Sequence, residues 1–332
     1  MDIRYLNPEE HELWDAFVDQ CPYGTIFHKT GWLLPVARFQ SLSFRIAACI
    51  RDGEILGGMA FTWKKKFGRI PVLQMPVKTP FFSPVIAPSQ SKYLSKTESQ
   101  LFEVAEALGD FLTNEYQWVQ ATFPTAFQDV RPFLWAGFNG KIHYTYRTVL
   151  SGTDDPLPDY DTPVRNKIKK GLRTEFEFRT GATRKDIGDA WELEQKSFRR
   201  QQFEMRYADK EEFTDFVESL IGSGAADMFS IVYQGQLVAS RILVLDRPKR
   251  TAYDWTAGAH EDHLSTGLNQ VLMYSIHKHL LESEFQVFDF VGAGTKSIAK
   301  YKSTFNFPLA ASYSISKARG LARIGMLLKN HR

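Results

Sequence analysis

The sequence predicts a mixed α/β fold that is built twice in tandem. Two patterns typical of β-hairpins, each an apolar run, a polar turn and a second apolar run, occur at residues 44–61 and 228–245. In both halves the hairpin is followed by a basic turn, a third strand, a long amphipathic helix and another strand. Because one element order occurs twice in 332 residues, we expect two similar domains of about 150 residues each.

The individual elements follow from local patterns in the same order in each half. A strand and a helix that contains a tryptophan, Trp14 or Trp191, open each half. The hairpin turns fall at Asp52-Gly53 and at Gln234-Gly235. After its hairpin, the first half is expected to have strands at 70–76, 118–123 and 142–150 and a helix at 95–114. The second half is expected to have strands at 251–258, 287–291 and 310–316 and a helix at 265–281.

The boundary between the halves is predicted in the acidic, turn-rich segment 151–163. This segment would link an N-terminal domain, 1–150, to a C-terminal domain, 164–332. The two copies differ at one chemically important position, since Lys302 on a short helix has no counterpart in the first half. Whether one copy or both are active stays open at this point.

Composition sets limits on the class of protein. A net charge of +3 gives no reason to expect a DNA partner, and 43% hydrophobic residues are enough for real cores. Cys21 and Cys49 form no metal-ligand pattern, and the histidines lack metal spacing, so no metal is expected. The start of the chain does not resemble a signal peptide, and no apolar run approaches the roughly 20 residues of a membrane helix. We therefore expect a cytoplasmic protein.

The segment 288–306, FDFVGAGTKSIAKYKSTFN, is the main candidate for chemistry. A strand ends in a turn containing Gly292 and Gly294, and residues at helical spacing follow. Such a turn presents backbone N–H groups at a helix N-terminus, where an anion is favoured. It is not a Walker loop, because Thr295 stands where that loop has a glycine. It is not a dinucleotide loop, because Ser297 stands where a third glycine is needed.

Four motifs occur in order along nearly the whole chain. They are Gly31-Trp32, then TPFFSPV at 79–85, then YTYRT at 144–148 with RNKIKK at 165–170, and finally FDF at 288–290 with YKSTF at 301–305. This series resembles the Fem-type peptidoglycan-bridge aminoacyltransferases and the broader FemAB-related group. The resemblance implies two tandem domains of the GCN5-related N-acetyltransferase (GNAT) fold. It also implies acyl or aminoacyl transfer to an amine.

The resemblance implies that Lys302 is catalytic, since the lysine at this position in Fem-type enzymes is held to meet the aminoacyl donor. An ammonium there could stabilise the oxyanion that forms as an amine attacks an acyl ester or thioester, with N–H groups near Gly292 and Gly294 assisting. Such a transfer needs no covalent nucleophile. The alternative is that Lys302 is a solvated helix lysine.

The identity of the donor is left open between acyl-coenzyme A and aminoacyl-tRNA. In the parent fold, a turn before the long helix binds the coenzyme A pyrophosphate. The matching stretch here, 263–269, contains Thr266 and Asn269 as candidate ligands but has a single glycine and no basic residue at the expected place. This departure favours a donor other than coenzyme A. The alternative is that Ser265 and Thr266 only cap the helix.

Several further residues are candidates for substrate contact. Tyr253 and Trp255 share one face of the third strand and Asp254 has the other, and we assign Tyr253 to catalysis and Trp255 to binding. Which of the two faces lines the site stays open. Arg165 and Lys169 form a basic helical stripe that could hold phosphates or could simply be a solvated face. The remaining candidates for substrate or donor binding are Arg206, Tyr301 and Phe82.

Taken together, these patterns predict an N-acyltransferase that works by direct attack in or near a cleft between its domains. The first domain is expected to be structural or on the acceptor side, and the second to bind the donor. The acceptor would be a small molecule or a cell-wall precursor, with aminoacyl-tRNA a possible partner. The amphipathic C-terminal residues could touch a membrane surface or dock on the domain. The alternative function is a ligand- or glycan-binding protein that has kept the fold and lost its donor site.

Overall fold

The computed structural model describes residues 1–151, 155–200 and 209–323, which divide into two compact units. Unit 1 comprises Met1–His143 and Ala311–Arg332, and unit 2 comprises Tyr144–Ala310. The predicted division at 151–163 therefore differs from the observed one. The change of unit occurs within two strands, β7 (Asn139–Val149) and β13 (Leu309–Ala318). The reason is strand pairing, because the end of β7 pairs with β12 of unit 2 and the end of β13 pairs with β6 of unit 1.

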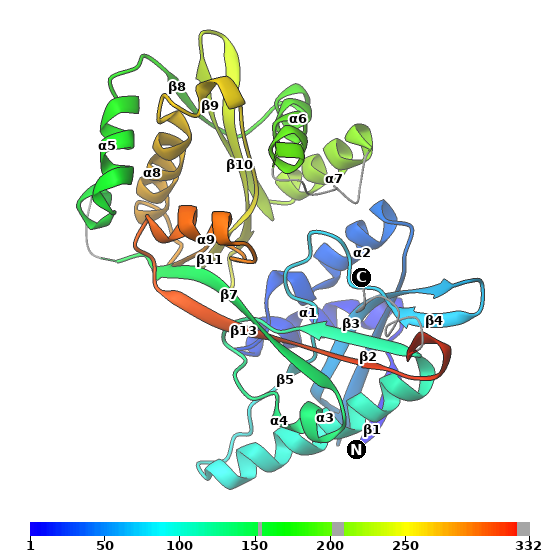
Figure 1. Ribbon diagram of the computed structural model, residues 1–332. Coiled ribbons are helices and arrows are strands. Elements are labelled where there is room, and N and C mark those ends of the chain that lie inside the picture. Colours follow the sequence, from blue (N-terminus) through cyan, green and yellow to red (C-terminus); the bar gives the residue numbers. More distant parts are fainter. Residues whose placement is uncertain (152–154, 201–208, 324–332) are drawn as a thin grey trace. The chain divides into compact units, whose positions relative to one another are not determined.

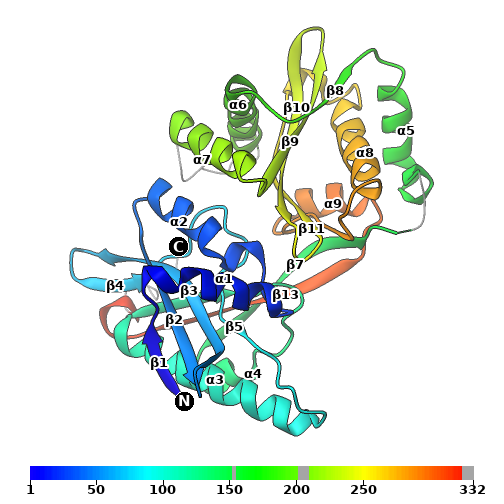
Figure 2. The same cartoon turned by 180° about the vertical axis from the view of Figure 1, so that it is seen from behind.

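Unit 1 is a mixed sheet in the order β1-β2-β3-β4-β6-β13, with β5 paired to β3. The β4–β6 pair is parallel and the other neighbouring pairs are antiparallel. Figures 1 and 2 show the unit from two sides. Its strands are β1 (Asp2–Tyr5), β2 (Ser43–Arg51), β3 (Glu54–Lys66), β4 (Ile70–Leu73), β5 (Val85–Ile86) and β6 (Trp118–Thr122). Its α-helices within the described residues are α1 (His11–Gln20), α2 (Thr30–Phe39), α3 (Leu94–Glu115) and α4 (Arg131–Trp135).

Unit 2 repeats this plan with the order β7-β12-β11-β10-β9-β8. The β11–β12 pair is parallel and the other neighbouring pairs are antiparallel. Its strands are β8 (Glu177–Thr180), β9 (Ala226–Tyr233), β10 (Gln236–Asp246), β11 (Thr251–Ala259) and β12 (Val287–Asp289). Its α-helices in the described part are α5 (Thr162–Gly171), α6 (Arg184–Arg200), α7 (Lys210–Gly222), α8 (Leu268–Leu281) and α9 (Lys296–Ser303). The predicted mixed α/β class is confirmed.

Two layers of helices enclose the sheet of unit 2. Helices α6 and α7 cover one face, whereas α8 covers the other and has α5 packed against it (Figures 1 and 2). The core on the α8 side is strongly apolar, and its buried members include Ile168, Ile231, Leu243, Ile276 and Phe288. The residues that alternate inward along β9 and β10 supply this core from the sheet, as the hairpin pattern predicts. Burial of these side chains is the main source of stability for the unit.

The central strands of unit 2 separate at one end. The parallel pairing of β11 with β12 covers only Thr251–Tyr253 against Val287–Asp289, after which β12 ends while β11 continues to Ala259. Beyond this point the chain turns away through Val291 and Gly292, which have φ of +51° and +85°. Asp254 therefore lies just past the end of the parallel ladder, and α9 follows directly after the turn.

Among the described residues, no helix has both the length and the apolar character needed to cross a bilayer. The same residues contain no group of three or more His, Cys, Asp or Glu side chains placed to hold a metal ion. Part of the predicted amphipathic C-terminal segment, residues 324–332, lies outside the described residues.

Candidate active site

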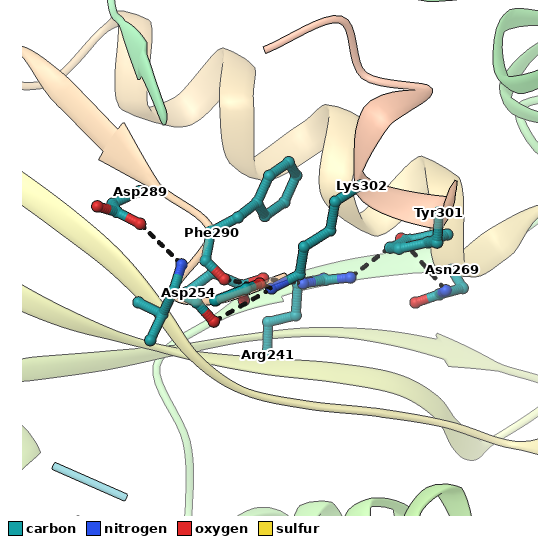
Figure 3. Close-up of polar contacts among 9 residues, drawn as sticks. Arg241, Asp254, Asn269, Asp289, Phe290, Tyr301 and Lys302 are labelled. Carbon is teal, nitrogen blue, oxygen red and sulfur yellow. Dashed lines mark hydrogen bonds and ion pairs between the residues drawn. The ribbon is translucent and has the colours of Figure 1, made fainter. Parts of the chain in front are cut away.

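Lys302 on α9 reaches back to the turn that follows β12. Its ammonium donates hydrogen bonds to three consecutive backbone carbonyls, those of Phe290, Val291 at 3.3 Å and Gly292 at 2.8 Å (Figure 3). The nitrogen also lies 5.5 Å from the centre of the Phe290 ring. Lys302 is half-buried, and burial lowers the pKa of its amine to about 8, although the nearby Asp254 carboxylate acts in the opposite direction. The alternative of a freely solvated lysine is therefore wrong for this structure.

A buried polar network fixes the shape of that turn. The Asp289 carboxylate, 1% exposed, accepts hydrogen bonds from the Thr145 hydroxyl at 2.6 Å and from the Val291 N–H at 2.8 Å. The Thr145 oxygen in turn accepts from the Gly292 N–H at 3.1 Å. Burial raises the pKa of Asp289, while the Thr145 hydrogen bond opposes this change. With its N–H groups held in this way, the turn directs three carbonyls at Lys302.

A buried ion pair lies beside Lys302. Arg241 of β10 and Asp254 of β11 pair through Nη1 and Oδ2, and both side chains are 3% exposed. The other terminal nitrogen of Arg241 donates to the Tyr301 hydroxyl at 3.0 Å, and the Asn269 amide donates to the same hydroxyl at 3.4 Å. Because the Tyr301 oxygen accepts from two donors, its own hydrogen is available to a further acceptor. Figure 3 shows these side chains gathered beside Lys302.

Two atoms of this ion pair lack a hydrogen-bond partner among the described residues. They are Asp254 Oδ1 and Arg241 Nε, both buried. The register shift between β10 and β11 explains why the pair lies here, since it makes Trp255 bulge out of the ladder between Asp254 and Thr256. Buried polar atoms are almost always paired, so two such atoms in one place require an explanation.

The turn before α8 is closed by α5. Gly267 has φ of +88°, and a Cβ atom added to it would lie 2.2 Å from the backbone oxygen of Lys167. Gly171 of α5 also lies close to α8, since a Cβ atom added to it would lie 2.6 Å from the Val271 side chain. Lys170 donates to the Ser265 carbonyl at 2.8 Å, which fastens the two segments together. The single glycine of this turn therefore allows close helix packing.

Thr266 contributes to the start of α8. Its hydroxyl accepts from the Leu268 N–H at 3.2 Å and donates to the His263 carbonyl at 2.6 Å. Thr266 lies one residue before the N-cap, Gly267, and α8 has no side-chain cap hydrogen bond, so Thr266 closes the preceding turn and does not cap the helix in the usual way. Asn269, one turn further on, contacts Tyr301 as described above.

The other predicted site residues lie away from this cluster or within the core. The Trp255 ring stacks on Phe213 of α7 at 6.1 Å, and Tyr253 is 5% exposed with its pKa raised by burial. The Tyr253/Trp255 pair is thus core, and Asp254 is the member of this strand that joins the cluster. Phe82 is 1% exposed in unit 1, where its backbone pairs with Thr122, so this apolar ring belongs to the core.

The remaining candidates are on the surface or outside the described residues. Lys169 of α5 is exposed, and Arg165 of the same helix is half-buried and donates to the Thr162 hydroxyl at 2.8 Å. Gly292 and Gly294 are exposed and have open space on their side-chain side. Arg206 lies outside the described residues.

The sequence reasoning did not single out three members of the cluster, Arg241, Asp289 and Thr145, and it left open whether Asp254 faces the site. One signal for Arg241 was present, because it is the single charged residue in the apolar run of the second hairpin, VASRILVL. A charge inside a buried strand requires a partner. The partner could not be identified from sequence, because the pairing depends on the register shift between β10 and β11.

Comparison with known proteins identifies the fold. Residues 161–303 match the family model described as an acetyltransferase (GNAT) domain. The matching solved structures include proteins with this fold in tandem, so the predicted resemblance and the predicted tandem GNAT-like fold are confirmed. The matched domain supports acyl or aminoacyl transfer in general terms. No curated protein matches the sequence.

Three solved structures illustrate the likeness. FemX is 14% identical with a TM-score of 0.70, and the match covers 99% of both chains. A tandem GNAT protein from the clavulanic acid biosynthesis pathway is 12% identical with a TM-score of 0.57, over 96% of this chain and 98% of that one. L-PGS from Bacillus licheniformis is 12% identical with a TM-score of 0.56, over 99% of this chain and 97% of that one. At these identities the likeness establishes the fold.

Proposed function

We propose that the protein transfers an acyl or aminoacyl group to an amine acceptor by direct attack. The observation that carries the proposal is the juxtaposition of the Lys302 ammonium and the available Tyr301 hydrogen where β12 ends and β11 continues. The cluster extends from buried groups to the exposed turn at Gly292.

The chemistry requires few protein groups. A neutral amine attacks the acyl carbon, a new C–N bond forms, and negative charge develops on the carbonyl oxygen before the ester or thioester bond breaks. The nitrogen then loses its proton, and the leaving oxygen or sulfur gains one. The Tyr301 hydroxyl can donate to the developing charge, and the Lys302 ammonium, whose three hydrogens go to backbone carbonyls, can stabilise it through its positive charge. Groups held in place before reaction are the most effective kind.

An aminoacyl ester is the donor that best fits unit 2. The turn before α8, which would hold the coenzyme A pyrophosphate in the parent fold, is packed against α5 with the Lys167 carbonyl facing Gly267. A carbonyl oxygen repels a phosphate. The exposed basic residues of α5, among them Lys167 and Lys169, offer an alternative place for the phosphates of a tRNA acceptor end. The acceptor is an amine on a small molecule or a cell-wall precursor.

The test is transfer of a radiolabelled group from acetyl-coenzyme A or from a panel of aminoacyl-tRNAs to a nucleotide-linked muropeptide and to simple amines. We expect Lys302→Met to remove turnover while the variant stays folded. Lys300→Met is the matched control, because Lys300 is exposed on the same helix. Full turnover by the Lys302 variant would contradict the proposed role of this lysine, and transfer from acetyl-coenzyme A alone would contradict the proposed aminoacyl donor. Binding without transfer would favour the binding-protein alternative.

A further inference from the structure

The Arg241–Asp254 pair contains a buried acceptor that nothing in the described part of the chain satisfies. Asp254 Oδ2 receives Arg241, whereas Oδ1 has no hydrogen-bond partner. Leaving a buried carboxylate oxygen without a hydrogen-bond partner is unfavourable, and more so for a charged group than for a neutral one. A structure retains such an atom most readily where a ligand completes it.

The position of Asp254 indicates which part of a ligand it meets. The carboxylate lies near enough to Lys302 to act on the pKa of that amine, and its partner Arg241 also holds Tyr301. A group bound to Oδ1 is therefore next to the reacting carbonyl. In an aminoacyl ester, the α-ammonium is attached to the carbon adjacent to that carbonyl. A simple acyl group has only carbon and hydrogen there and would leave Oδ1 without a partner.

The charges of the cluster allow a cation to bind. Two cations, Arg241 and Lys302, and two carboxyl groups, Asp254 and Asp289, act on one another, and Arg147 also acts on Asp289. Asp254 has a carboxylate oxygen without a hydrogen-bond partner among the described residues, so it is the carboxylate open to an added α-ammonium. The acceptor amine is a less suitable occupant, because it must be neutral to attack and a carboxylate would favour its charged form.

We propose that Asp254 Oδ1 binds the α-ammonium of an aminoacyl donor, and that this contact selects aminoacyl esters over simple acyl donors. The inference rests on the proposed function. It makes Asp254 a specificity-determining residue for the donor.

The experiment compares two stable donor analogues that differ in one group. They are 3′-glycylamino-3′-deoxyadenosine and 3′-acetylamino-3′-deoxyadenosine, and glycine is chosen because it has no side chain to clash. Affinity is measured by titration calorimetry on the full-length protein between pH 6.5 and 9.5. A charge-assisted hydrogen bond predicts about 10- to 100-fold tighter binding of the glycyl compound at pH 6.5. This preference should disappear above the α-amino pKa of about 8.

Variants test the assignment to Asp254. We expect Asp254→Asn, which keeps the size of the side chain, to bind the two analogues equally. The control Asp262→Asn, whose side chain is 82% exposed, should keep the full preference. The pH profile of the wild-type protein tests the idea even if the Asp254 variant does not fold.

The outcomes separate the two proposals. Equal binding of both analogues by the wild-type protein overturns the role of Asp254 and leaves acyl transfer intact. It would mean that Oδ1 closes a second bond to Arg241 instead. Binding of neither analogue overturns the inference together with the proposed donor site in unit 2.

Discussion

Lys302 should make the stability of the protein depend on pH. Burial lowers the pKa of Lys302 to about 8 from the ordinary value of 10.5. Between these two values the folded protein holds fewer protons at this position than the unfolded chain. The free energy of unfolding therefore has its full value, as far as Lys302 is concerned, above pH 10.5. It falls as the pH is lowered from 10.5 and reaches its lower limit once the pH has fallen through 8.

The size of the effect follows from the interval between the two pKa values. Each pH unit in this interval changes the free energy of unfolding by about 1.4 kcal/mol, so the whole change is about 3 kcal/mol. This change is the net result of opposing effects on the pKa of Lys302. Burial and the positive charge of Arg241 disfavour the ammonium, whereas the carboxylates of Asp254 and Asp289 favour it.

The assay is urea unfolding of the wild-type protein, Lys302→Met and Lys300→Met at intervals from pH 7 to 10.5. The difference in unfolding free energy between two proteins cancels the titration of all groups that they share. We expect the wild-type protein to gain about 3 kcal/mol over Lys302→Met as the pH rises through this range. Lys300→Met, at an exposed position of the same helix, is the matched control for loss of a lysine from α9.

Two results would refute the reasoning. A difference that is independent of pH would mean that the Lys302 amine keeps its ordinary pKa and is well hydrated. A difference that shrinks as the pH rises would mean that the three carbonyls stabilise the ammonium by more than burial disfavours it. The lysine would then clamp the turn, and an oxyanion would compete with the carbonyls for its protons.

Three further predictions concern stability. Asp254→Leu alone should lower the free energy of unfolding by about 3–5 kcal/mol, because it leaves the buried Arg241 guanidinium without its carboxylate partner. The double variant with Arg241→Met should recover most of this loss, and urea unfolding measures both. Gly267→Ala should cost more than about 2 kcal/mol, because its Cβ meets a backbone oxygen; Gly292→Ala, at a similar φ but in open space, should cost about 1 kcal/mol. Burial lowers the pKa of His28 to about 3, so the wild-type protein should lose stability from pH 6.5 to 3 and His28→Gln should lose less, as acid denaturation followed by circular dichroism can check.

The repeated element order could be predicted because its signals are local. Turn residues Asp52-Gly53 and Gln234-Gly235 adopt the positive φ angles that hairpin turns require, and apolar alternation marks the strands around them. The position of Lys302 on a short helix that follows a strand and a glycine turn was likewise readable from adjacent residues. The sequence did not reveal that the end of β7 joins the sheet of unit 2 and the end of β13 joins the sheet of unit 1. The two strands have the same apolar alternation whichever sheet they join.

The candidate site was predicted only in part because its charged members depend on contacts distant in sequence. Arg241 and Asp254 meet through the register of two strands, and a shift of one residue would have separated them. From sequence, the single glycine of the turn before α8, Gly267, was interpreted as part of an incomplete phosphate-binding turn. In the structure this glycine allows α5 to pack closely against the turn. A glycine can serve either purpose, so the sequence alone could not distinguish them.

The pairing of β13 with β6 has a consequence for synthesis of the protein, because these strands are far apart in the sequence. Most of unit 1 leaves the ribosome early, but the end of β13, which pairs with β6, comes last. At 5–20 residues per second, the first unit waits roughly 10 to 35 seconds for its final strand. During that time the edge of β6 is a target for wrong pairing and for chaperones. Expression of either half alone, cut at the acidic segment, would leave the same kind of edge uncovered permanently.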